Sequence, residues 1–302
     1  IDAHLADVEW THDHYAAQRV KDVLVDRLRA LGRGRPDVDT RNPSLRFVLH
    51  WERKIATLSL DTSGDPLFMR GYRRGVEAKA PMKETLAAAI LAIGHADVTR
   101  AFLDPCCGSG TLVVEQAWRS LNRAPGRDRR FGFERWSKRA PELDRALALA
   151  KTEARELERA APVAPLFASD WHKDAIDAAR TCLHNAGVDA HVRLEHVNAR
   201  RAEIPPGGVV CSNLPFGERL GTNRLQLDGF YRTLGERLAE HDGVRALLFT
   251  AHPGARSLLA LDDKAHRSRH WKLRSGAIDA HLYRWDIAIA SMDATNRPRQ
   301  SS

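Results

Sequence analysis

The sequence contains the stretch Ala101-Phe102-Leu103-Asp104, followed directly by Pro105-Cys106-Cys107-Gly108-Ser109-Gly110. A short apolar strand ends in an acid, a loop with two glycines follows, and a helix is predicted from Thr111. Glycine adopts backbone torsions that a Cβ forbids, and the amides at the start of a helix bind carboxylates. Asp104 can bind an ammonium group. A ligand that carries both groups, such as the methionine end of S-adenosylmethionine, fits this loop.

The main competing interpretations of the loop are a nucleotide site and a ligand-free turn. The stretch lacks a full GxGxxG, which dinucleotide sites use, and no Lys follows its last glycine, as a phosphate-binding loop requires. A ligand-free turn between a strand and a helix also accommodates two glycines. Asp104 argues against that interpretation, because an acid at the end of a strand needs a partner.

Outward from this loop, predicted strands alternate with predicted helices. Hydrophobic periodicity predicts strands over 99–103, 165–169, 191–197, 208–212 and 244–250, helices over 81–93, 111–121, 141–160, 174–186 and 227–241, and a closing antiparallel hairpin around Gly276. Such alternation implies a mostly parallel sheet with helices on both faces. Ligands bind these sheets at the carboxyl ends of the strands, near the switch in strand order.

A second acid stands at the end of the next predicted strand, where Leu166 to Ser169 leads to Asp170. An acid in this position accepts hydrogen bonds from the ribose hydroxyls of a nucleoside. It can equally cap the following helix by accepting hydrogen bonds from backbone amides. The residues alone leave both roles open.

The segment Asn213-Leu214-Pro215-Phe216 follows the apolar strand 208–212. Methylation of an exocyclic amine requires acceptors for its two N–H bonds and a flat surface for the base. The Asn213 side-chain oxygen and the Leu214 carbonyl supply acceptors, Pro215 restricts the backbone, and Phe216 can stack on a base. A proline turn with one buried Phe is the alternative for these four residues alone. Asp104, Asp170 and Asn213 all follow parallel strands, however, so we expect them at one edge of the sheet.

Residues 1–75 differ from the rest of the chain. The pattern predicts a helix around Val20 to Leu28, ended by Gly32 to Pro36, and two short strands over 45–50 and 55–60. One helix and one hairpin bury little core. The sequence begins at Ile1 rather than Met, so we expect a fragment whose first segment holds the second half of a domain.

Composition favours a soluble, cytoplasmic protein. The chain has 302 residues, of which 43% are hydrophobic, and no apolar run approaches the ~20 residues that span a bilayer. Its four cysteines form no CxxC pair and have no His at ligand spacing, so we expect reduced thiols and no metal site. The net charge of +8 concentrates polyanions near the surface.

Two groups of arginines are candidates for nucleic-acid contact. They are Arg70, Arg73 and Arg74, near Tyr72, and Arg127, Arg129 and Arg130, before Phe131. Basic residues interleaved with aromatics suit a phosphate backbone with unstacked bases. A solvated charge cluster remains the alternative.

Taken together, these features resemble the THUMP-containing class I RNA methyltransferases that modify guanine N2. The resemblance runs from about Val20 to about Ile289. It rests on the order and spacing of Val20-Lys21-Asp22, Leu60-Asp61-Thr62-Ser63-Gly64, Arg70-Gly71-Tyr72-Arg73, Ala80-Pro81-Met82-Lys83-Glu84, the loop from Asp104 to Thr111, Phe131-Gly132-Phe133-Glu134-Arg135-Trp136, and Ser212 to Arg219.

The resemblance implies an α/β architecture in three parts. Residues 1–75 are a partial THUMP RNA-binding module, residues 76–290 a Rossmann-like methyltransferase domain with a seven-stranded sheet and a closing antiparallel hairpin, and residues 291–302 a flexible tail.

The resemblance also assigns the site. Asn213 to Phe216 form the catalytic loop, and S-adenosylmethionine is bound by Asp104, Pro105, Cys106, Gly108, Ser109, Gly110, Asp170, Asn198, Pro81 and Met82. Asn198 stands where class I enzymes often carry an acid, and its amide can accept from the adenine N6 and donate to N1. Many relatives carry Pro in place of Leu214, a change that preserves the backbone carbonyl.

The implied substrate is guanine N2 in structured RNA. Ribosomal RNA of the large subunit (23S) is favoured over transfer RNA, because residues 20–73 look more like the ribosomal branch. DNA adenine or protein glutamine N-methylation uses the same amine-holding loop, but the THUMP remnant argues against both. An RNA-binding protein without catalysis is the alternative from another class, and the intact Asp104, Gly108, Asn213 and Phe216 argue against it.

Overall fold

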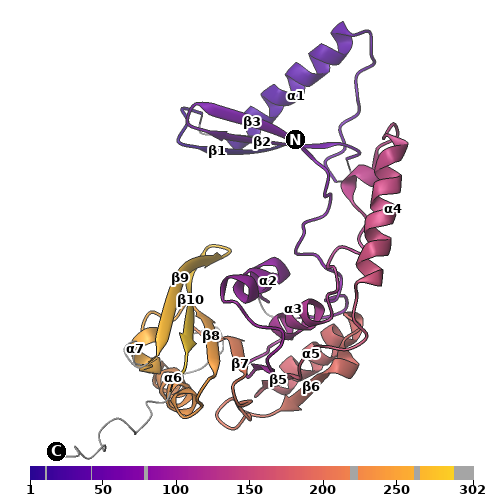
Figure 1. Cartoon of the computed structure of the whole chain (residues 1–302). Coiled ribbons are helices and arrows are strands. Elements are labelled where there is room, and N and C mark those ends of the chain that lie inside the picture. The colour runs from indigo at the N-terminus through magenta and orange to yellow at the C-terminus, as the bar shows by residue number, and fades with distance from the viewer. Residues whose placement is uncertain (11, 42, 78–80, 218–223, 262–265, 289–302) are drawn as a thin grey trace, which may run out of the picture. The chain divides into compact units, whose positions relative to one another are not determined.

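The computed structural model describes residues 1–10, 12–41, 43–77, 81–217, 224–261 and 266–288, drawn in colour in Figure 1. The chain divides into two compact units, residues 1–69 with 128–153 and residues 70–127 with 154–302. The expected tail at 291–302 lies outside the described residues, as do Ala80, Glu218 and Arg219 of the quoted motifs.

The second unit is built on a seven-stranded sheet with the order β6-β5-β4-β7-β8-β10-β9. Its strands are β4 (Phe102–Asp104), β5 (Leu166–Asp170), β6 (Val192–His196), β7 (Val209–Asn213), β8 (Arg245–Thr250), β9 (Arg267–Ser275) and β10 (Ile278–Asp286). The first five run parallel, and the β9–β10 hairpin closes the sheet antiparallel to β8. The predicted Rossmann-like sheet with its closing hairpin is confirmed.

The strand order reverses at β4. The chain moves from β4 to β5 and β6 on one side, then returns to place β7 on the other side of β4. Phe102 therefore pairs with Leu166 on one side and with Val209 on the other. The loops after β4 and β7 meet at this switch, which is where open α/β sheets bind ligands.

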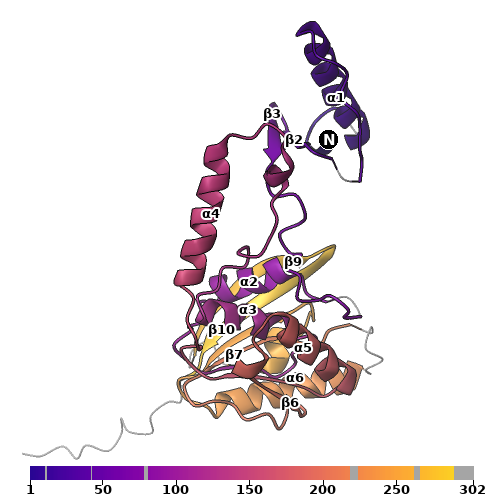
Figure 2. The ribbon, with the colours of Figure 1, turned by 90° about the vertical axis from the view of Figure 1, so that its right-hand side faces the viewer.

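Alternating side chains divide the core between the two faces of the sheet, because successive residues of a strand point in opposite directions. Phe102 and Leu247 belong to one buried cluster, with residues of α2 (Glu84–Ile93), α3 (Thr111–Ser120) and α5 (Lys173–Asn185). Leu103 and Leu248 belong to the other cluster, with residues of α6 (Arg224–Ala239) and α7 (Ala255–Leu259). Figures 1 and 2 show α2 and α3 on one side of the sheet and α6 on the other.

Two predicted boundaries shift for local reasons. The predicted strand from residue 99 begins only at Phe102, because the Asp97 carboxylate accepts the Thr99 amide (2.9 Å) and holds a turn there. The helix predicted from Pro81 begins at Glu84, and Lys83 before it has an extended backbone. The Met82 carbonyl accepts a hydrogen bond from Arg73 instead of a helical amide.

The first unit contains a three-stranded sheet, β1 (Asp2–Ala6), β2 (Arg46–Glu52) and β3 (Ile55–Asp61), with the helix α1 (Asp13–Ala30) packed on it. Ala16 of α1 meets Ala3 and Leu49 in a small buried cluster. β1 is not among the predicted strands, because it pairs parallel to β2 and parallel partners are not linked by a hairpin turn.

The segment 128–153, which interrupts the second unit in sequence, packs with the first unit. The segment contains a 3-10 turn (Gly132–Arg135) and most of α4 (Pro141–Glu156). A second 3-10 turn (Asp189–His191) belongs to the second unit, where it precedes β6. The Phe133 amide donates to the Thr62 carbonyl (3.2 Å), and Gly64 and Gly132 are so close that a Cβ on Gly132 would lie 2.9 Å from the Gly64 nitrogen.

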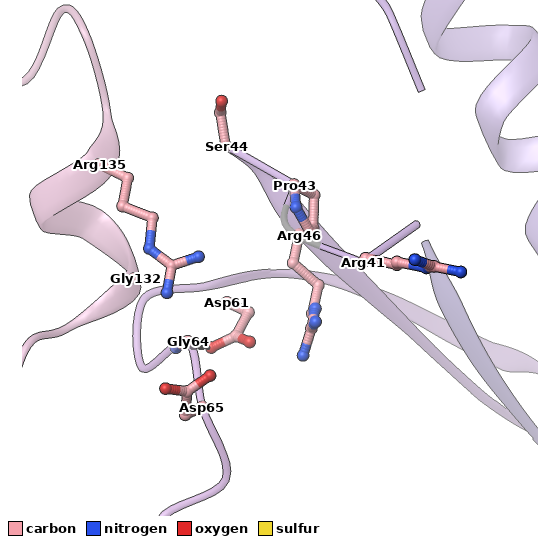
Figure 3. Close-up of a pocket in the computed structure, with 9 residues that line it drawn as sticks. All are labelled: Arg41, Pro43, Ser44, Arg46, Asp61, Gly64, Asp65, Gly132 and Arg135. Carbon is pink, nitrogen blue, oxygen red and sulfur yellow. Dashed lines mark hydrogen bonds between the residues drawn. The ribbon is translucent and has the colours of Figure 1, made fainter. Parts of the chain in front are cut away.

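A polar pocket marks this junction. It is lined by Arg41, Pro43, Ser44, Arg46, Asp61, Gly64, Asp65, Gly132 and Arg135, and Figure 3 shows Arg135 extending toward Asp61. The predicted boundary at residue 75 would place 128–153 with the methyltransferase domain, and the domain limits 1–75 and 76–290 remain predictions.

Among the described residues, no helix has the length and apolar character needed to cross a membrane.

Replacing Gly235 with Ala tests the packing of α6 on α7. A Cβ at Gly235 would lie 1.9 Å from the Leu259 carbonyl oxygen at the end of α7, so the backbones must move apart. We expect Gly235→Ala to lower the free energy of unfolding by about 1–3 kcal/mol in urea denaturation. Gly229→Ala in the same helix is the control, since its nearest atom is 3.9 Å away on the flexible Arg200 side chain. Equal stability of the two variants would contradict the packing.

Candidate active site

Asp104 ends β4 with its side chain almost fully buried, 1% exposed. Its Oδ1 accepts hydrogen bonds from Ser212 Oγ (2.6 Å) and from the Cys106 amide (3.3 Å). Burial raises the pKa of Asp104 to about 7, against the lowering effect of these two donors, and the nearby Asp170 adds to the rise. Burial destabilises the charged form of this carboxyl group. A cationic ligand stabilises that form, so the site favours a cation.

The glycine loop carries the chain from β4 into α3. Gly108 (φ +53°) and Gly110 (φ +79°) both occupy the left-handed region that favours glycine. Gly110 is the N-cap of α3 and offers no side-chain acceptor, so the first amides of α3 have no capping partner from it. A Cβ on Gly110 would also lie 3.4 Å from Ala179 Cβ of α5. The loop therefore presents backbone donors at a helix start, a site suited to a carboxylate.

Asp170 ends β5 beside this loop. Its Oδ2 accepts the Gly108 amide (2.9 Å) and its Oδ1 accepts the His172 amide (2.9 Å). Both oxygens thus hold backbone donors, one in the glycine loop and one at the start of α5. A carboxylate oxygen has capacity for a second hydrogen bond, so this arrangement leaves room for a ribose hydroxyl as well.

Asn198 follows β6, two residues beyond His196, which pairs with Asp170. Its Oδ1 accepts the Arg200 amide (2.9 Å), which closes a tight turn. The predicted adenine contact through this amide remains a prediction.

A buried ionic network adjoins the start of α3. Arg73 donates to Thr111 Oγ1 (2.7 Å) and to the Met82 carbonyl, and it lies 3.7 Å from Glu84 Oε2. This ties the segment that carries Pro81 and Met82 to the helix that follows the glycine loop. Pro81 and Met82, which are predicted to bind the cofactor, are thereby connected to the start of α3.

Arg70 extends this network to Glu115 of α3. Its Nε lies 2.9 Å from Glu115 Oε1, which also accepts the Tyr72 hydroxyl (3.2 Å). Burial raises the pKa of Glu115 to about 7 although Arg70 opposes the rise. Arg70 and Arg73 thus serve buried carboxylates, a placement that favours a structural role over RNA contact.

The other predicted RNA-binding arginines fall into two groups. Arg127 pairs with Glu158, and Arg129 donates to carbonyls of the first unit, including that of Pro66 (3.3 Å). Arg74 and Arg130 have exposed side chains. Contact of these residues with RNA remains a prediction.

The loop after β7 is held on both sides of Leu214. The Leu214 amide donates to the Phe249 carbonyl of β8 (2.9 Å), and the Pro215 carbonyl accepts the Tyr231 hydroxyl (2.9 Å). Phe216 is half-buried, and Gly217 has a positive φ of +72°.

Asn213 Oδ1 is buried and has no hydrogen-bond partner among the residues that the structure describes. Buried acceptors are nearly always paired in folded proteins. An unpaired amide oxygen beside a proline and an aromatic ring is therefore suited to receive an N–H group from a bound molecule.

Ser212 joins the two loops. Its hydroxyl donates to Asp104 Oδ1 and accepts the Cys106 amide (3.2 Å), so the residue before Asn213 touches the first residue of the glycine loop. The predicted meeting of Asp104, Asp170 and Asn213 at one sheet edge is what the parallel register produces. Ser212 has no predicted role, because a lone serine before a motif does not indicate its hydrogen-bond partner.

The two cysteines of the loop, Cys106 and Cys107, are in an environment that favours the protonated thiol. Burial raises the pKa of the Cys106 and Cys107 thiols well above the ordinary value, so both stay protonated. Among the described residues, no cluster of three or more His, Cys, Asp or Glu side chains could hold a metal ion.

Comparison with known proteins supplies an independent view. A family model described as "RMKL-like, methyltransferase domain" matches residues 70–284, and the THUMP domain model matches residues 4–61. A protein of Syntrophotalea carbinolica named ribosomal RNA large subunit methyltransferase K/L is 40% identical over 99% of this chain. The alignment covers 42% of that relative, so the chain spans less than half of the curated protein it matches.

Two solved structures share the fold. The candidate methyltransferase SMU.472, solved in complex with S-adenosylhomocysteine, superposes with a TM-score of 0.80 at 24% identity, over 95% of this chain and 75% of its own. A protein described as a possible methylase from Clostridium difficile 630 superposes with a TM-score of 0.83 at 24% identity, over 95% of this chain and 74% of its own.

The raised pKa of Asp104 predicts how stability depends on pH. Because the folded protein binds this proton more tightly than the unfolded chain, whose aspartates titrate near 3.8, stability falls as the pH rises from about 4 to about 7. Asp104→Asn cannot ionise. We expect it to lose less stability than the wild type between about pH 4 and about pH 7, measured by urea unfolding. Glu115 stays in both proteins and cancels from the difference. Parallel pH profiles would contradict the buried, proton-binding state of Asp104.

Proposed function

Since the chain belongs to the family of RMKL-like methyltransferases with a THUMP domain, we propose that it transfers a methyl group from S-adenosylmethionine to N2 of a guanine in 23S ribosomal RNA. The observation that carries the proposal is the buried, unpartnered Asn213 Oδ1 at the edge of the sheet where the glycine loop lies. The name of the Syntrophotalea carbinolica relative supports the ribosomal substrate over transfer RNA.

The residues around Asp104 fit the methionine end of the cofactor. The uncapped first amides of α3 suit its carboxylate, and the buried Asp104 carboxyl suits its ammonium group. Asp170 offers acceptor capacity for the ribose hydroxyls, and Asn198 stands at the neighbouring strand end for the adenine. Pro81 and Met82 close the site through their link to Arg73. Pro105, Cys106 and Ser109 shape the loop between these groups.

When bound, the cofactor supplies an electrophilic methyl group on a sulfonium. Asn213 Oδ1 accepts one N–H of the guanine amine, the Leu214 carbonyl accepts the other, and Phe216 stacks on the base, a contact worth ~1–3 kcal/mol in comparable complexes. The amine lone pair forms the new N–C bond while the C–S electron pair stays on sulfur, and one amine proton passes to water. Holding the amine in line with the methyl group provides most of the rate.

We assign the RNA-binding role of the chain to residues 1–75. The THUMP match over residues 4–61 supports this role. In the methyltransferase domain, Arg74 is the exposed member of its predicted group and the one to test for phosphate contact.

Asn213→Ala tests the proposal. We expect methyl transfer to fall by about 100-fold or more, because the amine loses an acceptor that orients it. Cofactor affinity should stay within a few fold, since Asn213 lies on the substrate side. The measurement is tritium transfer from labelled cofactor to 23S RNA, followed by nucleoside analysis for N2-methylguanosine.

Asp104→Ala is the matched contrast, expected to lose cofactor binding in calorimetry. Activity of Asn213→Ala equal to the wild type would refute the assigned role of the loop. A methylated nucleoside other than N2-methylguanosine in the wild-type reaction would refute the substrate.

A further inference from the structure

A buried chain of hydrogen bonds ends on the loop that holds the substrate amine. Tyr231, on α6, is fully buried and has its hydroxyl 2.9 Å from the Pro215 carbonyl and 2.5 Å from Thr250 Oγ1. The His252 amide donates to the same Thr250 hydroxyl (3.0 Å). His252, Thr250 and Tyr231 thus form a chain of hydrogen bonds that ends on the Pro215 carbonyl.

The direction of every bond in this chain is determined. A carbonyl has no hydrogen to give, so Tyr231 must donate to Pro215. A hydroxyl has one proton, so Thr250 must donate to the Tyr231 oxygen. The chain therefore runs from the His252 amide through Thr250 and Tyr231 to Pro215. Burial raises the pKa of Tyr231, so the phenol keeps the proton that it donates.

His252 anchors the far end. The Gly254 amide donates to its Nδ1 (3.1 Å), which places the ring proton of a neutral His252 on Nε2, 3.2 Å from Asp228 Oδ1. The imidazole packs against the Tyr231 ring with the centroids 4.9 Å apart. The turn between β8 and α7 is thereby attached to the phenol that holds Pro215.

Burial of these hydrogen-bonded polar groups among apolar side chains costs free energy, so folding stability alone does not account for them. Tyr231 lies in the apolar cluster that contains Leu214, Leu227, Leu234 and Leu238. A phenylalanine would fill the same space without buried polar atoms, and polar groups in such a cluster are tolerated only when each has a partner. The Tyr231 hydroxyl is thus explained by its hydrogen bond to the carbonyl of Pro215, which lies in the loop between Asn213 and Phe216.

We propose that Tyr231, supported by Thr250, is a positioning residue for methyl transfer that fixes the Pro215 carbonyl and so the relative placement of Asn213 and Phe216. This inference rests on the proposed function. Proline fixes φ but leaves ψ free. The Tyr231 bond to the carbonyl removes that remaining freedom, and Phe216 is the next residue along the chain. Tyr231 itself touches neither substrate nor cofactor.

Tyr231→Phe removes the bond and keeps the ring. We expect kcat to fall ~10–100-fold, because small displacements of positioning groups have effects of this size. The cofactor Kd and the KM for 23S RNA should change by less than about threefold, since the binding surfaces remain. A kcat within about twofold of wild type would overturn the proposal, as would a loss of kcat matched by loss of cofactor binding.

Three further substitutions separate positioning from general packing. Thr250→Val removes the donor to Tyr231 and should lower kcat, whereas Thr250→Ser keeps the hydroxyl and should restore it. Tyr283→Phe is the control, because Tyr283 is buried in the same cluster and stacks on Trp285. It should retain wild-type kcat. Equal losses in Tyr231→Phe and Tyr283→Phe would overturn the proposal.

Hydrogen exchange gives a readout that does not depend on the substrate. In Tyr231→Phe we expect faster amide exchange in 211–217 and unchanged exchange in 104–110, measured by mass spectrometry. Unchanged exchange in 211–217 would overturn the positioning role. Absence of RNA methylation by the wild type, with faster exchange in the variant, would instead reject the proposed function and leave the anchoring of the loop established.

Discussion

The hydrogen bond from Ser212 Oγ to Asp104 Oδ1, 2.6 Å long, joins the ends of β4 and β7 at the point where the strand order reverses. Each partner belongs to a different loop of the site. Asp104 opens the glycine loop, and Ser212 precedes Asn213. The bond therefore sets the separation between the groups suited to the cofactor and those suited to the amine. Methyl transfer requires the two reactants in line within a short distance, so the proposed chemistry depends on this contact.

The site contains several groups that work against folding stability. Asp104 is buried with a raised pKa, Asn213 Oδ1 has no partner among the described residues, and Glu115 lies buried beneath Arg70. Buried carboxyl groups with raised pKa values and buried polar atoms without partners are concentrated at ligand-binding sites. The surrounding clusters on both faces of the sheet compensate, since they bury apolar residues from β4, β5, β6, β7, β8 and β10. The apolar clusters of this domain thus provide folding stability, whereas the buried polar groups named above are suited to ligand binding.

Ion pairs within the protein divide the six arginines that are candidates for RNA contact. Six were candidates from their spacing, yet Arg70 and Arg73 pair with buried carboxylates and Arg127 pairs with Glu158. These partners lie 11 to 45 positions away, so no local pattern announces them. In the described part of the chain, Arg74 and Arg130 are the candidates whose side chains remain exposed.

The α/β alternation, the closing hairpin, the glycine loop and the Asn213-Leu214-Pro215-Phe216 segment can be predicted from the sequence, because each depends on periodicity or on residue types that are local in the chain. The tertiary structure alone decided that Asp170 holds backbone amides, that Arg73 ties Met82 to Thr111, that 128–153 packs with the first unit, and that Tyr231 holds Pro215. These contacts join residues that are distant in sequence, and their partners are chosen by the packing of strands and helices rather than by any local pattern.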